Sequence, residues 1–431
     1  MIGIYKNKAD PGKEYQLKQV IGHGGYCNVY VALHKPTEQF VAIKKYKDFF
    51  KNSVDTKNIL KEMMIFRVLS HTFSPQFPKV KDLFVTEAEV TKEFPFFKTI
   101  NMAIEVCDMD LRHFLFSDRA LSYVQAKTIC FKMVACVYEL HCRGLFHRDL
   151  KPENFLINLK NLEVKLTDFN HAMLITQPMT TTPKSSVTKI PSLFSVSTKK
   201  GKLETKILGT RYYRAPEILL LEDYDSRIDI WGLGCIMWEV MARVFANKKE
   251  PLFVGKYCET ISPTDKENII NNHQKPKMVV LSEEDQIMTI LKKLGRQMGE
   301  PFSFVSKPNI RSFLIGQNAK MPKCSIMNPF GKQMIDFELF EDMLRHCLNF
   351  NPQQRISIDD LISHEFFKEF DPDDFKRQNF KELVFDWPTL KDGLAKEKFS
   401  LFVLLLKELN HYHDLELYEE LVEPFIQKHS E

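Results

Sequence analysis

The segment HRDLKPEN, at residues 147–154, is the most informative part of this 431-residue chain. It brings three polar residue types together at close spacing. The carboxylate of Asp149 can accept a proton from a hydroxyl group, the ammonium of Lys151 can neutralise a phosphoryl group, and the amide oxygen of Asn154 can bind magnesium. The plainer alternative is a capped turn whose charges are solvated. The segments found elsewhere in the chain decide between these two interpretations.

A glycine-rich segment near the N-terminus, GHGGYCNV at residues 22–29, lies between two strand-like runs, and VAIK follows at residues 41–44. Because glycine has no Cβ, the backbone amides of such a turn can approach phosphates closely. Lys44 on the next strand can then pair with the phosphates. Taken alone, the segment is more simply a β-turn. The VAIK sequence at this distance favours a phosphate-binding loop.

These two segments resemble the protein kinases, whose pattern includes a glycine-rich loop, VAIK and the HRD catalytic loop. Further matching segments are DFN at 168–170 (DFG in the family), TRYYRAPE at 210–217, DIWG at 229–232 and the arginine of NPQQR, Arg355. Lysine two residues after Asp149 is typical of serine/threonine kinases, and the YRAPE form is similar to the cyclin-dependent and MAP kinases. The chain most resembles a divergent MAP kinase, strongly over residues 15–367.

The resemblance implies transfer of the γ-phosphate of ATP, with Mg²⁺, to Ser or Thr hydroxyls of proteins. It implies catalytic roles for Asp149, Lys151, Lys44 and Glu62, and magnesium ligation by Asn154 and Asp168. It implies ATP contacts for Ile21, Gly22, Gly24, Gly25, Val29, Ala42, Lys44, Glu105, Cys107 and Leu156. Without the other motifs, Glu62 would be interpreted as a solvated helix charge, and the apolar residues as ordinary core.

Two positions depart from the family pattern: Cys27 replaces the third glycine of the loop, and Asn170 replaces the glycine of DFG. A small side chain at position 27 is expected to be tolerated. Asparagine visits the left-handed backbone region more easily than most residues, so Asn170 is expected to cost about 1 kcal/mol against glycine. It should shift the conformations of the following segment without abolishing chemistry. A pseudokinase that binds nucleotide or partners without turnover is the alternative.

The periodicity of apolar residues predicts an α+β fold. Strand patterns occupy residues 15–50 and 78–106, whereas helical patterns occupy Asp55–His71, Ala126–Leu140 and Ile228–Ala242. The family fold then implies two lobes, a β-rich N-lobe at 15–106 and a mainly helical C-lobe at 107–367. Polar segments at 175–206 and 256–281 are expected to be insertions. Residues 368–431 form a C-terminal helical extension that is expected to pack on the kinase domain.

Regulatory features follow from the resemblance. Arg148 before the catalytic aspartate implies control by phosphorylation, and Thr205 lies where related kinases carry their activating threonine. An upstream kinase is therefore expected to act on Thr205, although the tyrosine of the MAP-kinase Thr-x-Tyr pair is missing. The alternative is that Thr205 is an ordinary residue of a Ser/Thr-rich loop without a regulatory role. Arg214 is expected to favour proline after the phosphoacceptor.

The C-terminal extension carries two further MAP-kinase-like features. Asp371, Asp373 and Asp374 resemble an acidic site for basic docking peptides, with an ordinary helix stop as the alternative. The pattern from Leu415 to Phe425 resembles the helix that MAP kinases pack against the small lobe.

Composition excludes several other classes. A formal net charge of +4 is too small to indicate a protein that binds nucleic acid. Nine scattered cysteines without a CxxC pair predict reduced thiols in place of disulfides or zinc. The first ten residues lack the apolar core of a signal peptide, and the longest apolar run, Leu401–Leu406, is too short to span a bilayer. The chain is therefore expected to be a soluble protein of the cytoplasm or nucleus, with no membrane partner.

Overall fold

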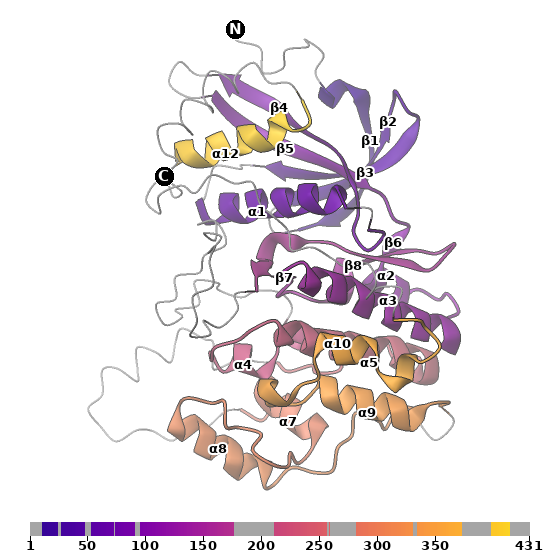
Figure 1. The fold of residues 1–431 in the computed structure, drawn as a ribbon, viewed down its shortest axis with the longest axis vertical. Coiled ribbons are helices and arrows are strands. Elements are labelled where there is room, and N and C mark those ends of the chain that lie inside the picture. Colours follow the sequence, from indigo (N-terminus) through magenta and orange to yellow (C-terminus); the bar gives the residue numbers. More distant parts are fainter. Residues whose placement is uncertain are drawn as a thin grey trace, which may run out of the picture.

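The computed structural model describes residues 11–24, 27–47, 53–72, 74–90, 95–175, 211–256, 258, 282–330, 334–372 and 398–413. These residues form two lobes, one built on a β-sheet and the other on helices (Figure 1). This arrangement confirms the α+β bilobal fold. Among the described residues, none of the helices combines the length and apolar character that crossing a membrane requires. All nine cysteines are free thiols, as their spacing predicted.

The N-lobe is a five-stranded antiparallel sheet with strand order β1-β2-β3-β5-β4. Its strands are β1 (Tyr15–His23), β2 (Cys27–His34), β3 (Gln39–Lys47), β4 (Val80–Val90) and β5 (Pro95–Glu105). Helix α1 (Ser53–Ser70) packs its apolar residues, including Leu60, Met63 and Phe66, into the core, at the spacing the sequence predicted. The register places Val29 opposite Lys44 and Ala42 opposite Ile104.

The larger lobe is organised around two long helices, α3 (Tyr123–Cys142) and α5 (Arg227–Ala246). The first begins with a capping box between Ser122 and Gln125. The second is buried along nearly its whole length, which is the position of a central core helix. Around them lie α2 (Leu111–Phe116), α4 (Pro216–Leu219), α7 (Gln286–Leu294), α8 (Pro308–Asn318), α9 (Phe337–Cys347) and α10 (Ile358–Ile362).

Short strands and 3-10 helices carry most of the segments that the sequence singled out. The strands are β6 (Met109–Asp110), β7 (Leu145–Phe146), β8 (Phe155–Asn158), β9 (Glu163–Leu166) and β10 (Met173–Leu174). The 3-10 helices are η1 (Pro11–Glu14), η2 (Pro152–Asn154), η3 (Phe169–His171), η4 (Arg211–Tyr213), η6 (Pro352–Gln354) and η7 (Glu365–Phe367). One continuous apolar cluster extends from the sheet through α1 to the C-lobe helices. The site residues are thus held by a shared core.

A helix of the C-terminal extension, α12 (Lys398–Asn410), returns to the N-lobe and packs against α1 and β4 (Figure 1). Its Leu401–Leu406 run is buried. The helix expected from Leu415 to Phe425 lies outside the described residues, as do most of the two predicted insertions. Among the described residues, α12 makes the packing of the extension on the N-lobe.

Candidate active site

The HRDLKPEN segment forms a loop that is anchored from below by Asp229 on α5. The buried carboxylate of Asp229 accepts the backbone N–H groups of His147 (2.7 Å) and Arg148 (2.9 Å) and lies 2.9 Å from Nε2 of His141. Burial would raise the pKa of Asp229, but the contacts to His141 and His147 lower it, so the carboxylate stays ionised. This anchor holds Arg148 in a left-handed backbone conformation, with φ of 72°.

Asp149 lies at the tip of this loop with its side chain largely buried. The Nζ atom of Lys151 lies 2.7 Å from its carboxylate, and the amide nitrogen of Asn154 donates to its backbone carbonyl at 2.8 Å. Burial raises the pKa of Asp149, an effect that Lys151 opposes. Burial would lower the pKa of Lys151, but Asp149 raises it overall. The loop thus holds a carboxylate beside an ammonium group.

A second buried ion pair connects β3 to α1. Nζ of Lys44 contacts Oε1 of Glu62, and the hydroxyl of Tyr46 donates to Oε2 of the same carboxylate at 2.8 Å. Burial would lower the pKa of Lys44, but Glu62 raises it above its usual value, so Lys44 carries its charge. The register of β2 and β3 places this lysine beneath the glycine-rich turn. Glu62, which alone would be an ordinary helix charge, is fully buried.

The DFN segment follows β9 at the base of the site. Phe169 is fully buried and its ring lies 5.0 Å from that of Phe66, 5.9 Å from that of Phe77 and 5.6 Å from that of His147. Asp168 has a left-handed backbone with φ of 69°. Burial would raise its pKa, but Lys44 and Lys151 lower it overall, so its carboxylate is charged.

The expectation for the backbone of Asn170 is wrong. Asn170 lies within the 3-10 helix η3, and the left-handed residue of the segment is Asp168. The conformational cost expected at Asn170 therefore does not arise there. Instead, the Asn170 side chain is buried, and its amide nitrogen donates to Oδ1 of Asp168 at 2.6 Å.

The residues assigned to magnesium suit a hard divalent cation. Asp168 offers a charged carboxylate, and Asn154 uses its amide nitrogen on Asp149, so the amide oxygen is the atom it can present. Carboxylate and amide oxygens are the ligands that Mg²⁺ and Ca²⁺ take in proteins. Lys44 and Lys151 interact electrostatically with Asp168, so the cations and the candidate metal ligands meet in one place.

The residues assigned to ATP lie on the N-lobe sheet and at its junction with the C-lobe. Ala42 is buried on β3, Val29 and Leu156 are half-buried on β2 and β8, and Ile21 is exposed on β1. The N–H of Gly24 donates to the carbonyl of Cys27 at 2.7 Å, which closes the glycine-rich turn, while Gly25 lies outside the described residues. Burial raises the pKa of the Cys27 thiol to about 11, so it stays neutral.

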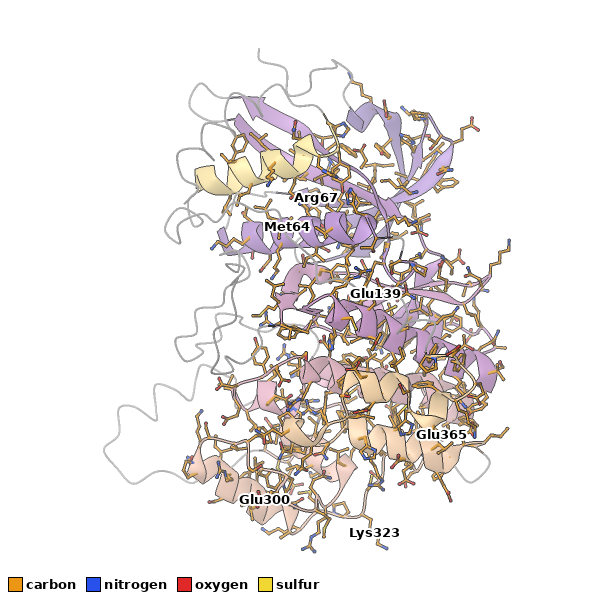
Figure 2. All side chains as sticks on the ribbon, viewed as in Figure 1. Met64, Arg67, Glu139, Glu300, Lys323 and Glu365 are labelled. Carbon is orange, nitrogen blue, oxygen red and sulfur yellow. The ribbon has the colours of Figure 1, made fainter. Side chains whose placement is uncertain are left out.

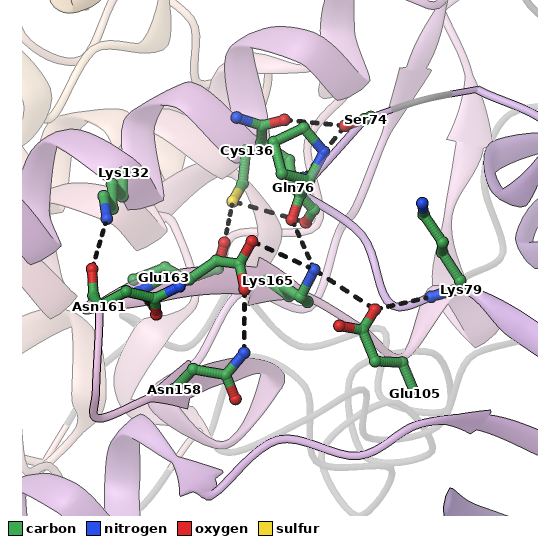
Figure 3. Close-up of polar contacts among 12 residues, drawn as sticks. Ser74, Gln76, Lys79, Glu105, Lys132, Cys136, Asn158, Asn161, Glu163 and Lys165 are labelled. Carbon is green, nitrogen blue, oxygen red and sulfur yellow. Dashed lines mark hydrogen bonds and ion pairs between the residues drawn. The ribbon is translucent and has the colours of Figure 1, made fainter. Parts of the chain in front are cut away.

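The segment that joins the lobes is fixed by a polar cluster that sequence reasoning missed (Figure 3). The buried ammonium of Lys165 on β9 lies 3.3 Å from the Glu105 carboxylate and donates to the Pro75 carbonyl at 3.0 Å. The backbone N–H of Glu105 donates to the Lys79 carbonyl at 2.8 Å. Cys107, two residues further on, is half-buried. A lysine in a short polar-apolar strand gives no sequence signal for this role.

Beneath the site, Arg355 and Glu217 form a buried bidentate pair, with Nη2 of Arg355 2.6 Å from Oε2 of Glu217. Glu217 ends the APE motif and Arg355 ends NPQQR, two of the segments in which the chain matches the family. It ties the end of the segment after DFN to the C-lobe. Such a pair fixes geometry more than it adds stability.

Arg148 has partners that the sequence did not reveal. Its guanidinium donates to the hydroxyl of Tyr224 at 2.5 Å and to the carbonyl of His171 at 3.2 Å. Lys61 on α1 is buried nearby, and burial together with Arg148 lowers its pKa to about 7. Two basic side chains therefore face the same region.

The predicted regulatory residues are mostly not described. Thr205, Asp373 and Asp374 lie outside the described residues, whereas Asp371 is exposed.

Comparison with known proteins agrees with this geometry. The model of the family described as "Protein kinase domain" matches residues 15–367. The chain is 27% identical over 406 residues to mitogen-activated protein kinase 2 of Pneumocystis carinii, covering 92% of this chain and 95% of the relative. It is 26% identical over 404 residues to mitogen-activated protein kinase PMK1 of Pyricularia oryzae, covering 93% and 95%. A Petunia hybrida homologue, mitogen-activated protein kinase homolog 1, is 28% identical over 348 residues, covering 80% and 73%.

Proposed function

Because the chain belongs to the protein kinase family and its relatives are MAP kinases, we propose that it is a proline-directed, MAP-kinase-like signalling enzyme that uses MgATP. The observation that carries the proposal is the convergence of Lys44–Glu62, Asp149–Lys151 and Asp168 around one site. The proposal places the enzyme in the cytoplasm or nucleus, where its nine free thiols would stay reduced.

The roles of the site residues follow from their geometry and charge. Asp149 orients the substrate hydroxyl and accepts its proton, and Lys151 beside it opposes the charge that develops on the transferring phosphoryl group. Lys44, held by Glu62, pairs with the phosphates of ATP. Asp168 and Asn154 would hold magnesium, which neutralises phosphate charge when bound. Most of the catalysis is then positioning and electrostatic stabilisation.

Adenine is assigned to the junction of the lobes, between Ala42 and Val29 on one side and Leu156 on the other. The backbone groups of Glu105 and Cys107 would meet its edge. The anchoring of Glu105 by Lys165 supports this assignment, since it fixes the backbone that the base must reach. Gly22 and Gly24 would allow the backbone of the loop to approach the phosphates, because glycine has no Cβ that would occupy the space between them.

Proline preference is assigned to Arg214, which lies three residues before Glu217 and interacts electrostatically with Asp149. Matched peptides that differ only in proline or alanine after the phosphoacceptor serine test it. We expect kcat/KM to be about tenfold higher for the proline peptide, a difference of about 1.4 kcal/mol in transition-state free energy. Equal values for the two peptides would refute proline direction while leaving kinase activity intact.

Regulation is assigned to Thr205, with Lys61 and Arg148 as the basic groups that receive its phosphate. The lowered pKa of Lys61 supports this assignment, because an incoming dianion would restore its charge. Thr205→Ala should reduce activity, and mass spectrometry should find phosphate on Thr205 of the active protein. Wild-type activity of the variant, together with an unmodified Thr205, would remove the assignment.

The second candidate is a pseudokinase scaffold, which Cys27 and Asn170 favour as departures from the family pattern. It predicts nucleotide or partner binding without phosphotransfer.

Docking of basic peptides at Asp371, Asp373 and Asp374 is compatible with both candidates. A lysine-rich peptide whose affinity is unchanged when all three aspartates are replaced by asparagine would show that this acidic segment is not the docking site.

A further inference from the structure

Two histidines meet where the helix of the C-terminal extension packs against α1. Nε2 of His411, the residue after α12, lies 3.2 Å from Nε2 of His71, the residue after α1. The two residues are 340 positions apart in the chain. Both are exposed, so an ion can reach them from solvent. The proposed phosphotransfer uses neither of them.

A hydrogen bond on the far side of the His71 ring fixes where its hydrogen lies. Nδ1 of His71 lies 2.6 Å from the carbonyl oxygen of Arg67, and because a carbonyl only accepts, Nδ1 is the donor. Nε2 of the neutral ring therefore holds a lone pair, and this is the nitrogen that meets His411. Metal-binding histidines have the same arrangement, in which one nitrogen donates to a carbonyl and the other binds the ion.

The relation between the two rings suits a shared ion. Two imidazole nitrogens on one tetrahedral zinc ion lie about 3.3 Å apart, since each Zn–N bond is about 2.0–2.1 Å long. The ring centroids are 5.0 Å apart and the ring planes differ by 69°. A linear N–H···N bond would place the centroids roughly 5.5 Å apart, the N···N distance plus two ring radii. The rings are thus inclined to each other, as two ligands of one ion must be.

A second group of candidate ligands, Asp342, His346 and His364, lies on the C-lobe and differs in this respect. Nδ1 of His364 accepts the backbone N–H of Phe366 at 3.1 Å, so Nε2 carries the hydrogen of the neutral ring and donates it to Asp342 at 3.1 Å. Neither nitrogen of that ring keeps a lone pair for a metal. The pair at the end of α1 is therefore the better site.

We propose that His71 and His411 bind a divalent transition-metal ion, with Zn²⁺ as the cation that two imidazole ligands suit. Water would fill the remaining coordination positions, which makes an open site of moderate affinity. Because the two ligands come from distant parts of the chain, the ion would fasten the extension to α1, the helix that carries Glu62. An ion that binds only the docked arrangement stabilises it by mass action.

The test is Zn²⁺ titration of the full chain by calorimetry, after chelator treatment and with excess Mg²⁺ to occupy the proposed nucleotide site. His71→Ala and His411→Ala each remove one ligand. His346→Ala is the matched control, since it removes an exposed histidine of the second group. Hydrogen exchange of the wild type with and without Zn²⁺ measures the fastening of α12 and needs no variant.

We expect one Zn²⁺ site in the wild type and in the control. Loss of an outer partner alone costs about 10- to 100-fold in metal affinity, so each ligand variant should lose at least about tenfold. Zn²⁺ should slow hydrogen exchange in α12 and at the end of α1. Equal Zn²⁺ affinity in all four proteins, or none in the wild type, would show an ordinary hydrogen bond between the two rings and overturn the proposal. Zn²⁺ binding that leaves hydrogen exchange in α12 unchanged would refute the fastening.

Discussion

Glu62 is a fully buried carboxylate whose two oxygens are divided between Lys44 and Tyr46. Tyr46→Phe removes the donor to Oε2 and leaves that oxygen buried without its partner. We expect the free energy of unfolding to fall by about 1–3 kcal/mol, measured by urea denaturation. Tyr30→Phe on the adjacent strand is the control, since the Tyr30 hydroxyl makes no side-chain hydrogen bond among the described residues. Equal losses in both variants would contradict the role of Tyr46.

Lys61 gives a pH dependence whose sign can be stated. Burial and Arg148 lower its pKa from 10.5 to about 7, so between these values the unfolded chain binds more protons than the folded one. Stability should therefore rise with pH in this window, by at most about 1.4 kcal/mol per pH unit from this group. Lys61→Met should flatten that rise in urea denaturation curves at about pH 7.5 and about pH 9.

The control for this prediction is Lys81→Met, which replaces an exposed lysine on β4. It should keep the wild-type pH dependence. A wild-type slope in the Lys61 variant would show that Lys61 stays protonated in the folded protein throughout this range. The assignment of a phosphate-receiving basic site to Lys61 and Arg148 would then lose its electrostatic support.

The contact between α1 and α12 joins the C-terminal extension to the helix that carries Glu62. Nε of Arg67 lies 2.9 Å from Oε2 of Glu408, and both side chains are buried (Figure 2 labels Arg67 on α1, beside α12). Further along, Nε2 of His413 lies 2.6 Å from Oδ1 of Asp82 on β4. The first contact joins α12 to α1, the helix that carries Glu62, and the second joins the extension to β4.

Glu408→Ala should therefore weaken the docking of α12 by about 3–5 kcal/mol, because the buried Arg67 would lose its ion pair with this carboxylate. Hydrogen exchange should become faster in both α12 and α1, and kcat/KM should fall. Glu341→Ala is the matched control, since it breaks an exposed Glu–Arg pair with Arg345 that is worth about 1 kcal/mol or less. Unchanged hydrogen exchange in α1 after Glu408→Ala would show that the docking of α12 does not stabilise the helix that carries Glu62.

The extent of each helix and strand was predictable where periodicity was strong, as for α1, α3 and α5. The ion pairs Lys44–Glu62 and Arg355–Glu217 were also predictable, because each partner lies in a short motif. Tyr46, Lys165 and Glu408 were not. Their partners are brought close by strand register and by chain return across up to 341 residues, and their residue types are ordinary for exposed helices and strands. Local spacing carries no signal for such contacts.

The whole molecule joins an N-lobe that carries the Lys44–Glu62 pair to a C-lobe that carries the Asp149–Lys151 pair. Lys44 comes from the sheet, Asp149 from the loop anchored by α5, and Asp168 from the segment between the lobes. One apolar core passes through all three regions. One departure from the family pattern, Asn170, is accommodated within the fold, since it lies in the 3-10 helix η3 and its amide nitrogen donates to Oδ1 of Asp168.

The decisive measurement is single-turnover transfer of the phosphoryl group from γ-labelled MgATP to a serine-containing protein. The wild type is compared with Asp149→Asn. The variant keeps the size of the side chain but cannot accept the hydroxyl proton. We expect the transfer rate to fall about 10²- to 10⁴-fold while nucleotide affinity stays close to that of the wild type. Equal transfer by both proteins, or none by either, would contradict a phosphotransferase centred on Asp149.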